Sequence, residues 1–447
     1  AFGVEGTFGI GDREFTYDIG TTFARNRQSD ITYGLFNLAA LRDALGPSML
    51  DGAGNPVCVR TPGNLATQIP GCVPMNLLGG LGSMTPAMLR YSTFVAQDNL
   101  GYEMEHYFAH FSGDIAKLPA GMLSFAAGLE RRDESGFDSP DALIASGNTT
   151  GNARTPTLGG YNVSEAYLEL AIPVLKGLPG VHKLDLSLAT RTSDYSNFGN
   201  TTNSKAGVRW EVTPNVLVRG NWSQGFRAPS VLELFQGQSD SFPVIADPCS
   251  TTFGGGYALL TPQQQARCHA QGVPIGGYDQ GNPQIRITVG GNTTLKPEEA
   301  ETVTFGVVLS PPMLPGFDVS LDWWQIDLTE AIATYTGGAI LHNCIREGRP
   351  EFCALFTRAP GGSISSLLSV PANVATTKVE GYDLTLNYRL PRTRFGSFAV
   401  NWDTTYMKEY IDSEGLNRVG EYFDRDNYWR IRSNVATRWE MGSHGAT

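Results

Sequence analysis

The sequence has few charged residues and no long apolar segment. Charged residues make up 17% of the 447 positions, against about 25% in an average soluble protein. No apolar run reaches the roughly 18 residues that a membrane-spanning helix requires. The 33 basic residues are dispersed among 44 acidic ones and form no positive stripe, so we expect no nucleic-acid partner.

Sequence signatures of enzymes and metal sites are also missing. The chain contains no GxSxG elbow, no Walker loop and no GxGxxG before a helix. No CxxC pair occurs. His106 and His110 lie in a predicted strand, where residues four apart are separated by about 13 Å, too far to share one metal ion. We therefore expect no enzymatic activity, no cofactor and no metal site.

The N-terminal residues do not form a secretory signal. Ala1 to Gly9 alternate between apolar and polar residues, without the basic start and apolar core of a signal peptide. We expect that residues preceding Ala1 have been removed or lost.

The sequence does contain many segments in which apolar and polar residues alternate. Leu184, Leu186 and Leu188 alternate with Lys183, Asp185 and Ser187, as in a strand with one apolar and one polar face. About thirteen such segments occur, most of them longer than typical globular strands: 1–9, 13–25, 99–114, 121–132, 160–173, 181–192, 203–213, 215–225, 299–310, 316–328, 377–389, 396–409 and 428–440.

The connections between these segments fall into two alternating classes. One class is short and rich in Pro or Gly: 10–12, 117–120, 174–180, 213–215, 311–315 and 391–394. The other class is mostly long: 26–98, 133–159, 194–202, 226–298, 329–376 and 411–427. This alternation puts the short turns at one edge of an antiparallel sheet and the long loops at the other, as in bacterial outer-membrane barrels.

Three architectures have to be compared: a transmembrane barrel, a soluble sandwich and a propeller. The segment lengths suit tilted strands that cross a bilayer. Tyr and Trp residues lie near segment ends, as at membrane interfaces: Trp222, Trp323, Trp324, Tyr388, Trp402, Tyr428, Trp429 and Trp439. No blade-length repeat is visible, which excludes the propeller. We therefore predict an all-β fold, a transmembrane antiparallel β-barrel with long extracellular loops that contain short helices.

The number of strands predicts an incomplete barrel. Single-chain bacterial barrels use an even number of strands and must close, because an open edge in lipid leaves backbone groups without hydrogen bonds. Thirteen is odd, and the chain stops at Gly442 to Thr447, where another short turn is expected. We therefore expect that strands are missing at both ends.

The six cysteines fall within three of the long loops, two in each. We expect the disulfides Cys58–Cys72, Cys249–Cys268 and Cys344–Cys353, because pairing within a loop is the simplest of the fifteen connectivities. Disulfides indicate an oxidising compartment, here the periplasm or the cell surface. Two loop segments also predict short helices, one beginning at Thr261-Pro262 and ending at Gly272, the other within Gly338 to Gly348.

Polar residues on the inner face carry the functional inference. A barrel filled by its own side chains would place apolar groups inside, whereas the inner positions here are charged and require water or a polar filler. A barrel of this kind moves solutes or holds a plug. The charged positions are Lys183, Asp185, Arg191, Lys205, Arg209, Glu211, Arg219, Asp318, Asp322, Arg430 and Arg432.

Two motifs resemble those of TonB-dependent outer-membrane receptors. The stretch 222–235 reads WSQGFRAPSVLELF and the stretch 292–306 reads NTTLKPEEAETVTFG. The first resembles the strand that ends in a Gly-Phe-Arg-Ala-Pro turn, and the second the Leu-Lys-Pro-Glu lead into the next strand. The matching residues are Gln224, Gly225, Phe226, Arg227, Ala228, Pro229, Leu295, Pro297 and Glu298.

The resemblance implies a 22-stranded barrel around an N-terminal plug, of which residues 1–447 would be the barrel portion without the plug, the first strands and the last strands. It also implies import of a scarce ligand, a siderophore, cobalamin, oligosaccharide or peptide, energised by the inner-membrane TonB complex through a region absent here. The expected surroundings are the lipids of the bacterial outer membrane. A surface-exposed adhesion or structural barrel without transport is the alternative.

Overall fold

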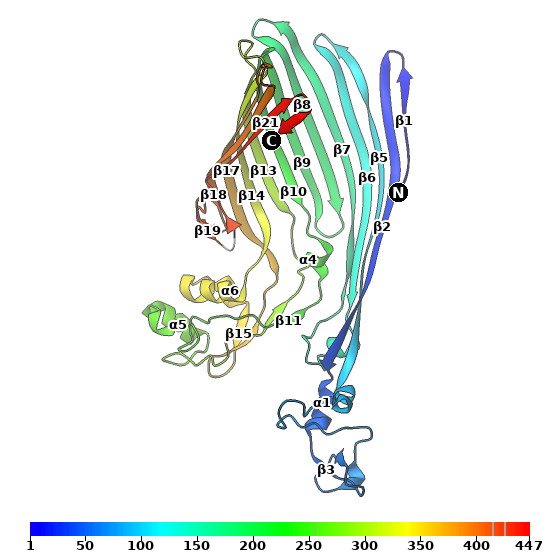
Figure 1. The fold of residues 1–447 in the computed structure, drawn as a ribbon, viewed down its shortest axis with the longest axis vertical. Coiled ribbons are helices and arrows are strands. Elements are labelled where there is room, and N and C mark those ends of the chain that lie inside the picture. The colour runs from blue at the N-terminus through cyan, green and yellow to red at the C-terminus, as the bar shows by residue number, and fades with distance from the viewer. Residues whose placement is uncertain (255, 414, 424–425) are drawn as a thin grey trace.

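Fourteen antiparallel strands form one curved sheet in the computed structural model, which describes residues 1–254, 256–413, 415–423 and 426–447. Every strand pairs with its neighbours in chain order (Figure 1). The strands are β1 (Phe2–Ile10), β2 (Arg13–Phe36), β5 (Thr93–Leu118), β6 (Gly121–Ser139), β7 (Thr157–Leu178), β8 (Val181–Tyr195), β9 (Gly199–Thr213), β10 (Val216–Arg227), β13 (Glu298–Leu309), β14 (Phe317–Thr334), β17 (Pro371–Arg389), β18 (Ser397–Ile411), β21 (Ile431–Met441) and β22 (His444–Ala446).

The predicted all-β fold is confirmed, and each of the thirteen predicted segments is a strand of this sheet. The predicted number is one too low, because β22 is too short for alternation to reveal it. Gly442 makes the turn before β22 at φ 61°, a left-handed conformation that glycine adopts without steric cost. Within the described residues β1 and β22 pair with one neighbour each, so the sheet is an open wall and not a closed cylinder.

Several strands extend further than their sequence pattern predicts. β2 and β5 remain paired from Phe15–Gly113 to Phe36–Thr93, although the predicted segments end at residue 25 and begin at residue 99. Residues 25–30 of β2 are all polar, so alternation ends there while the backbone hydrogen bonds continue. β21 deviates in the other direction, since it begins at Ile431 and leaves Tyr428 and Trp429 outside the sheet.

The short and long connections lie at opposite edges of the sheet, as predicted (Figure 1). We call these edges the turn end and the loop end. The predicted connection 194–202 was wrongly placed in the long class, because only residues 196–198 separate β8 from β9. The pairing of Thr192 with Thr202 and of Tyr195 with Gly199 continues the hairpin through residues that were expected to form a loop.

The loop end carries the small helices and strands. The first loop holds α1 (Leu38–Leu45), β3 (Ser48–Leu50), β4 (Pro56–Cys58), η1 (Leu65–Thr67) and α2 (Pro86–Ser92), and the next holds α3 (Ala142–Ala145). Later loops hold α4 (Val231–Phe235), β11 (Ser239–Ser241), η2 (Tyr257–Leu259), α5 (Pro262–Ala270), β12 (Ile287–Val289), α6 (Gly337–His342), η3 (Asn343–Glu347), α7 (Pro350–Cys353), β15 (Phe356–Arg358), β16 (Ile364–Leu367), β19 (Tyr422–Phe423) and β20 (Asp426–Asn427). Among the described helices, none has the length and apolar character needed to cross a bilayer.

Both predicted loop helices form. Thr261 caps α5 by accepting a hydrogen bond from the Gln264 amide, and Pro262 takes the first helical position. The second predicted helix is α6 continued by the π-helical η3, and it stops at Gly348, whose φ of 72° ends the helical path.

One face of the sheet is apolar and exposed. Large side chains project from it and remain 37% to 65% exposed, far above the exposure of residues in a soluble core: Ile19, Phe23, Leu129, Leu168, Leu186, Leu188, Trp210, Phe305, Leu321, Trp402, Ile431 and Val435. A continuous apolar surface of this extent marks a region covered by another apolar phase. We call this the apolar face, and the opposite one the polar face.

A charge placed on the apolar face should be costly. Leu188 lies there, paired with Leu170 and Ala206, so Leu188→Lys should lower the free energy of unfolding by about 2–4 kcal/mol in a bilayer. Urea titration of the protein in lipid vesicles measures this. The control is Ser187→Lys, on the polar face of the same strand, which should change stability by less than about 0.5 kcal/mol. Equal effects of the two substitutions would contradict the assignment of the faces.

Candidate functional site

The polar face carries ion pairs that cross between neighbouring strands. The Arg191 guanidinium donates to Glu165 at 3.2 and 2.8 Å and lies 3.0 Å from a Glu130 oxygen. Ser193 donates to the same Glu165 carboxylate at 2.5 Å. On the other side of Glu130, His106 Nε2 lies 3.3 Å from its carboxylate. These groups satisfy one another, so this part of the polar face is lined by neutralised pairs.

Glycine permits one of these pairs to span two strands. Arg219 on β10 donates to Asp322 on β14 at 2.8 and 2.7 Å, although β13 lies between them. The intervening position is Gly306, where a Cβ atom would meet Asp322 Oδ1 at 1.8 Å. Because Gly306 has no side chain, the space above it is free, and the ion pair between Arg219 and Asp322 forms in that space.

The charged inner-face positions predicted from the sequence lie on the polar face, with one exception. Lys183 pairs with Asp185 at 2.9 Å, and Arg209 pairs with Glu211. Arg430 precedes β21 and donates to the Val419 carbonyl at 3.3 Å. Its predicted place on a strand is wrong, because pairing with β18 begins only at Ile431. Within the described part of the chain, no group of three or more His, Cys, Asp or Glu side chains could hold a metal ion.

The two sequence motifs meet at the loop end of β10 and β13. Arg227, the last residue of β10, donates to Glu298 at 2.8 Å through both Nε and Nη2, and to Glu233 of α4 at 2.9 and 3.1 Å. Glu298 is the first residue of β13 and also accepts a hydrogen bond from the Ile332 amide at 2.8 Å. One guanidinium thus joins the two motifs to each other and to the helix between them.

The apolar motif residues anchor α4 against the polar face. Leu295, 3% exposed, packs with Val231 and Leu234 of α4 and with Tyr161, Val163 and Tyr195 of the sheet. Phe226 and Ala228 lie against the same cluster, and Pro229 is fully buried.

The other motif residues have smaller roles. Gln224 accepts a hydrogen bond from the Ser204 amide at 3.3 Å, a side chain at Gly225 would meet open space, and Pro297 is half-buried. The structure therefore brings the motif residues together between the sheet and its loops. We call the contacts of Arg227 with Glu233 and Glu298 the Arg227 joint.

Glu233 is a member of this joint that the motif residues did not include. Ser230 and Glu233 form a capping box, in which Ser230 Oγ accepts from the Glu233 amide and Glu233 accepts from the Ser230 amide. The Ser-x-x-Glu pattern is visible in the sequence and was a usable signal. Burial acts to raise the pKa of Glu233, but hydrogen bonds from Arg227 and Ser230 hold that pKa below its ordinary value.

Two long loops fold together into one body, which we call the loop cap (residues 236–297 and 335–370; Figure 1). Its core includes Ile245, Tyr278, Ile340, Ile345 and Leu367, all less than 10% exposed. Arg267 on α5 donates to the carbonyls of Ile345 and Arg346 at 3.0 and 2.8 Å. The two loops therefore share one core.

A fully buried ion pair lies at the centre of the loop cap. Arg358 donates to Asp247 at 2.6 and 3.1 Å, and the two side chains are 1% and 0% exposed. The Tyr278 hydroxyl and the Cys249 amide also donate to Asp247, at 2.7 and 2.9 Å. Burial and the Asp247 carboxylate raise the pKa of Tyr278, which keeps its hydroxyl a donor. No sequence signal marked this pair, because its members are 111 positions apart.

The predicted disulfides are confirmed. Cys58 pairs with Cys72 in the first loop, while Cys249–Cys268 and Cys344–Cys353 both lie within the loop cap. In the chain-entropy model, cross-links of this span each stabilise by about 3 kcal/mol. Each disulfide closes one loop, and the buried ion pair and the shared core join one loop to the other.

The sequence and the fold match known proteins consistently. The family model described as "TonB dependent receptor-like, beta-barrel" matches residues 7–446. The chain belongs to the TonB-dependent receptor family. The barrels of this family reside in the bacterial outer membrane, so the apolar face is the surface that contacts lipid. Among curated protein sequences, none is significantly similar to this chain.

Solved receptors are similar to this chain at low sequence identity. A mutant of the ferric enterobactin receptor PfeA from Pseudomonas aeruginosa is 12% identical with a TM-score of 0.50, over 96% of this chain and 47% of that one. The siderophore receptor PirA from Acinetobacter baumannii is 13% identical with a TM-score of 0.46, over 98% of this chain and 56% of that one. The chain thus spans about half the length of the receptors it matches.

Removing the Arg227 guanidinium should loosen the joint between the two motifs. Arg227→Met leaves Glu233 and Glu298 facing each other without a counter-charge. Because the Arg227 side chain is 46% exposed, we expect a loss of only about 1–2 kcal/mol in the free energy of unfolding. Urea titration in detergent measures this loss. Arg131→Met, which removes an exposed pair with Asp133, is the matched control and should have almost no effect; a similar loss in both variants would argue against the joint.

Acid should weaken the same joint. Because the folded-state pKa of Glu233 lies below its ordinary value of 4.5, its contribution is complete above that value and is lost as pH falls through the lower folded pKa. We expect Glu233→Gln to be less stable than the parent at pH 6, with a difference that shrinks as the pH is lowered towards 3. Thermal unfolding across this range tests the prediction, and a difference that grows on acidification would contradict it.

Proposed function

We propose that this chain is the barrel portion of an outer-membrane active transporter, which imports a scarce ligand with energy supplied through TonB. The observation that carries the proposal is the polar face, which faces away from the lipid and carries ion pairs between strands. Charged side chains on the inner face of a barrel require water or a polar filler. Such a lining suits a path for polar solutes.

The loop cap supports ligand capture at the outer surface. It is a folded body with its own core, positioned at the loop end by α4 and by the Arg227 joint. Long loops that form their own structure in a barrel are usually functional. We infer that the loop cap contributes to the outer binding surface and that the polar face leads from it towards the turn end.

A growth comparison tests the proposal. A strain lacking the gene and its parent would be grown on single limiting nutrients, namely ferric siderophores, cobalamin, oligosaccharides and peptides, and each experiment would be repeated in a strain without TonB. We expect at least one nutrient whose use is lost in both mutants. If every nutrient is used normally while adhesion to surfaces is lost, the alternative of an adhesion barrel would replace the transporter.

The role of the loop cap can be tested on the same nutrient. Arg358→Met leaves the Asp247 carboxylate buried without its partner, so the two loops should separate and ligand binding to whole cells should fall at least tenfold. Arg349→Met is the control, because Arg349 pairs with Glu351 on the cap surface, where both side chains are about half exposed. Protease cleavage reports whether the loop cap has opened in the Arg358 variant. If it has opened and ligand binding is unchanged, the loop cap is not needed for ligand capture.

A further inference from the structure

The connection between β17 and β18 is basic, although the protein as a whole is acidic. Residues 389–396, which we call the basic turn, read RLPRTRFG and include Arg389, Arg392 and Arg394 but no acidic residue. The whole chain has a net charge of -11, and the neighbouring connection, residues 310–316, contains no charged residue. All three arginines are exposed. Positive charge is therefore concentrated at one place on the turn end of the sheet.

The arginines of the basic turn have no counter-charge. On the polar face, by contrast, arginines are held by carboxylates, as Arg191 is by Glu165. In the part of the chain that the structure describes, no carboxylate or carbonyl oxygen binds the guanidinium groups of the basic turn. Glu440 of the neighbouring strand β21 is engaged by Arg438 at 2.6 Å. The charge of the basic turn therefore stays unneutralised and attracts anions.

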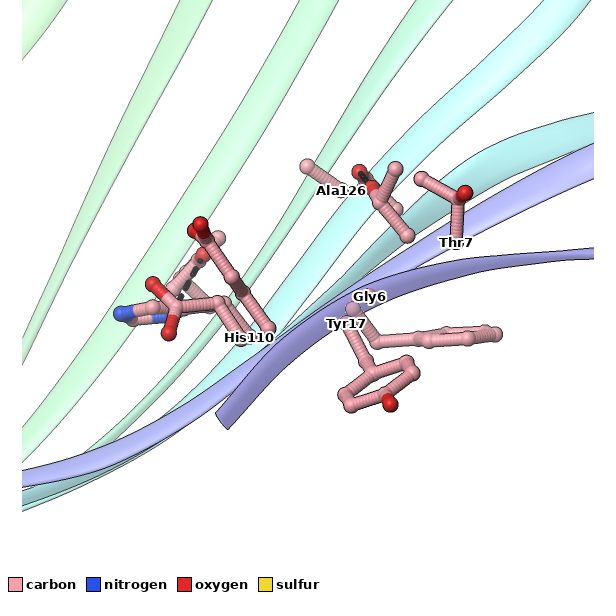
Figure 2. Close-up of a pocket in the computed structure, with 11 residues that line it drawn as sticks. Gly6, Thr7, Tyr17, His110 and Ala126 are labelled. Atoms are coloured by element: carbon pink, nitrogen blue, oxygen red, sulfur yellow. Dashed lines mark hydrogen bonds between the residues drawn. The ribbon is translucent and has the colours of Figure 1, made fainter. Parts of the chain in front are cut away.

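Alternation decides on which side of the sheet a residue of a strand lies. Figure 2 shows this in the first two strands, where Thr7 and Tyr17 lie on opposite sides of the ribbons. Leu386 pairs with Trp402 on the apolar face, and Arg389 is three positions further along the same strand. Arg389 therefore lies on the polar face, and the other two arginines belong to the tip of the basic turn.

The tip of the basic turn lies against the apolar face. The Phe395 carbonyl accepts a hydrogen bond from Trp439 Nε1 at 2.6 Å. Trp439 belongs to the apolar face, since it is four positions from Val435 on β21. Gly396 permits this approach, because its φ of 102° suits glycine and a Cβ atom there would lie 3.0 Å from Trp439 Nε1. Phe395 is thus held at the outer rim of the sheet.

Aromatic and apolar side chains around the basic turn mark the membrane interface. The rings of Phe317 and Tyr388 are in contact, with centroids 5.7 Å apart. Met313 and Leu314 of the neighbouring connection are 86% and 47% exposed. Tyr and Trp side chains gather where the hydrocarbon of a bilayer meets the lipid headgroups. The basic turn therefore lies at the level of the lipid phosphates.

Arg394 combines a cation with an apolar surface. Its guanidinium carbon lies 4.6 Å from the centre of the Phe395 ring, and that ring is 59% exposed. Stacking covers one face of the planar guanidinium and leaves its N–H edges free to donate. Arginine donors suit a phosphate group, and the exposed ring beside them suits the apolar part of the same lipid molecule.

We propose that the basic turn binds the headgroup phosphate of an anionic phospholipid in the periplasmic leaflet, with Arg392 and Arg394 as donors and Phe395 beside the acyl chains. The short turns of an outer-membrane barrel lie on the periplasmic side, which assigns the leaflet. The site continues the lipid-contacting apolar face. It concerns anchoring in the membrane and does not depend on which ligand the receptor transports.

Native mass spectrometry of the delipidated full-length receptor in detergent tests the inference, with phosphatidylglycerol and phosphatidylcholine of equal chain length as probes. We expect tighter binding of phosphatidylglycerol. Because each basic residue near an anionic lipid surface contributes about 1 kcal/mol, Arg392→Gln and Arg394→Gln should each weaken this binding about 5-fold, and the double variant about 30-fold. Equal binding of the two lipids, or unchanged binding in the double variant, would overturn the inference.

Two control variants separate a lipid site from general effects of charge or folding. Arg389→Gln removes a charge from the same turn on the polar face and should weaken binding less than either other substitution. Equal losses for all three arginines would contradict a defined site. Replacing both Arg392 and Arg394 by lysine retains the charge and should weaken binding less than the glutamine pair; an equal loss would mean that an altered turn is responsible.

Two further probes distinguish the possible sources of the phosphate. At constant ionic strength, inorganic phosphate should not displace phosphatidylglycerol, since it lacks the acyl chains that contact Phe395; displacement would mean a site for the free anion. Lipid A is the second probe. If the double glutamine variant loses binding of lipid A but not of phosphatidylglycerol, the assignment to the periplasmic leaflet is wrong and the inference fails.

Discussion

The pairing of backbone groups between antiparallel strands is the constraint on which the rest of this structure depends. In lipid no water can satisfy a free amide or carbonyl, so every residue of a spanning strand must pair with a neighbour. Pairing of this kind forces side chains to alternate between faces. One face then meets lipid, and the charged residues collect on the other, where Arg191, Glu165 and Glu130 neutralise one another.

Fixed register also explains how glycine contributes to the polar face. Gly306 lets Arg219 reach Asp322 across an intervening strand, and Gly128 lets Tyr167 and His110 meet. In both places a Cβ atom would occupy the space in which two longer side chains interact. The function of these positions lies in the pairs beside them, which is invisible when each glycine is considered alone.

The loop end is organised by a different kind of interaction. The loop cap has an apolar core, two disulfides and the buried Asp247–Arg358 pair. A buried ion pair stabilises little in net terms, but removing one partner is costly, because the other charge remains in an apolar environment. The pair therefore fixes which segments of the two loops meet. Nearer the sheet, Arg227 donates to Glu298 of β13 and to Glu233 of α4, and so connects the sheet to that helix.

The sequence by itself determined thirteen of the fourteen strands of the sheet, their order and the disulfides, because each depends on local periodicity or on residues close together in the chain. It also identified Arg227 and Glu298 as motif residues, whereas the ion pair between them came from the structure. Tertiary structure alone decided the extent of the β2–β5 ribbon, the buried Asp247–Arg358 pair and the contact of the basic turn with Trp439. These features depend on register and on contacts between distant segments, whereas alternation in one strand determines only which face each side chain takes.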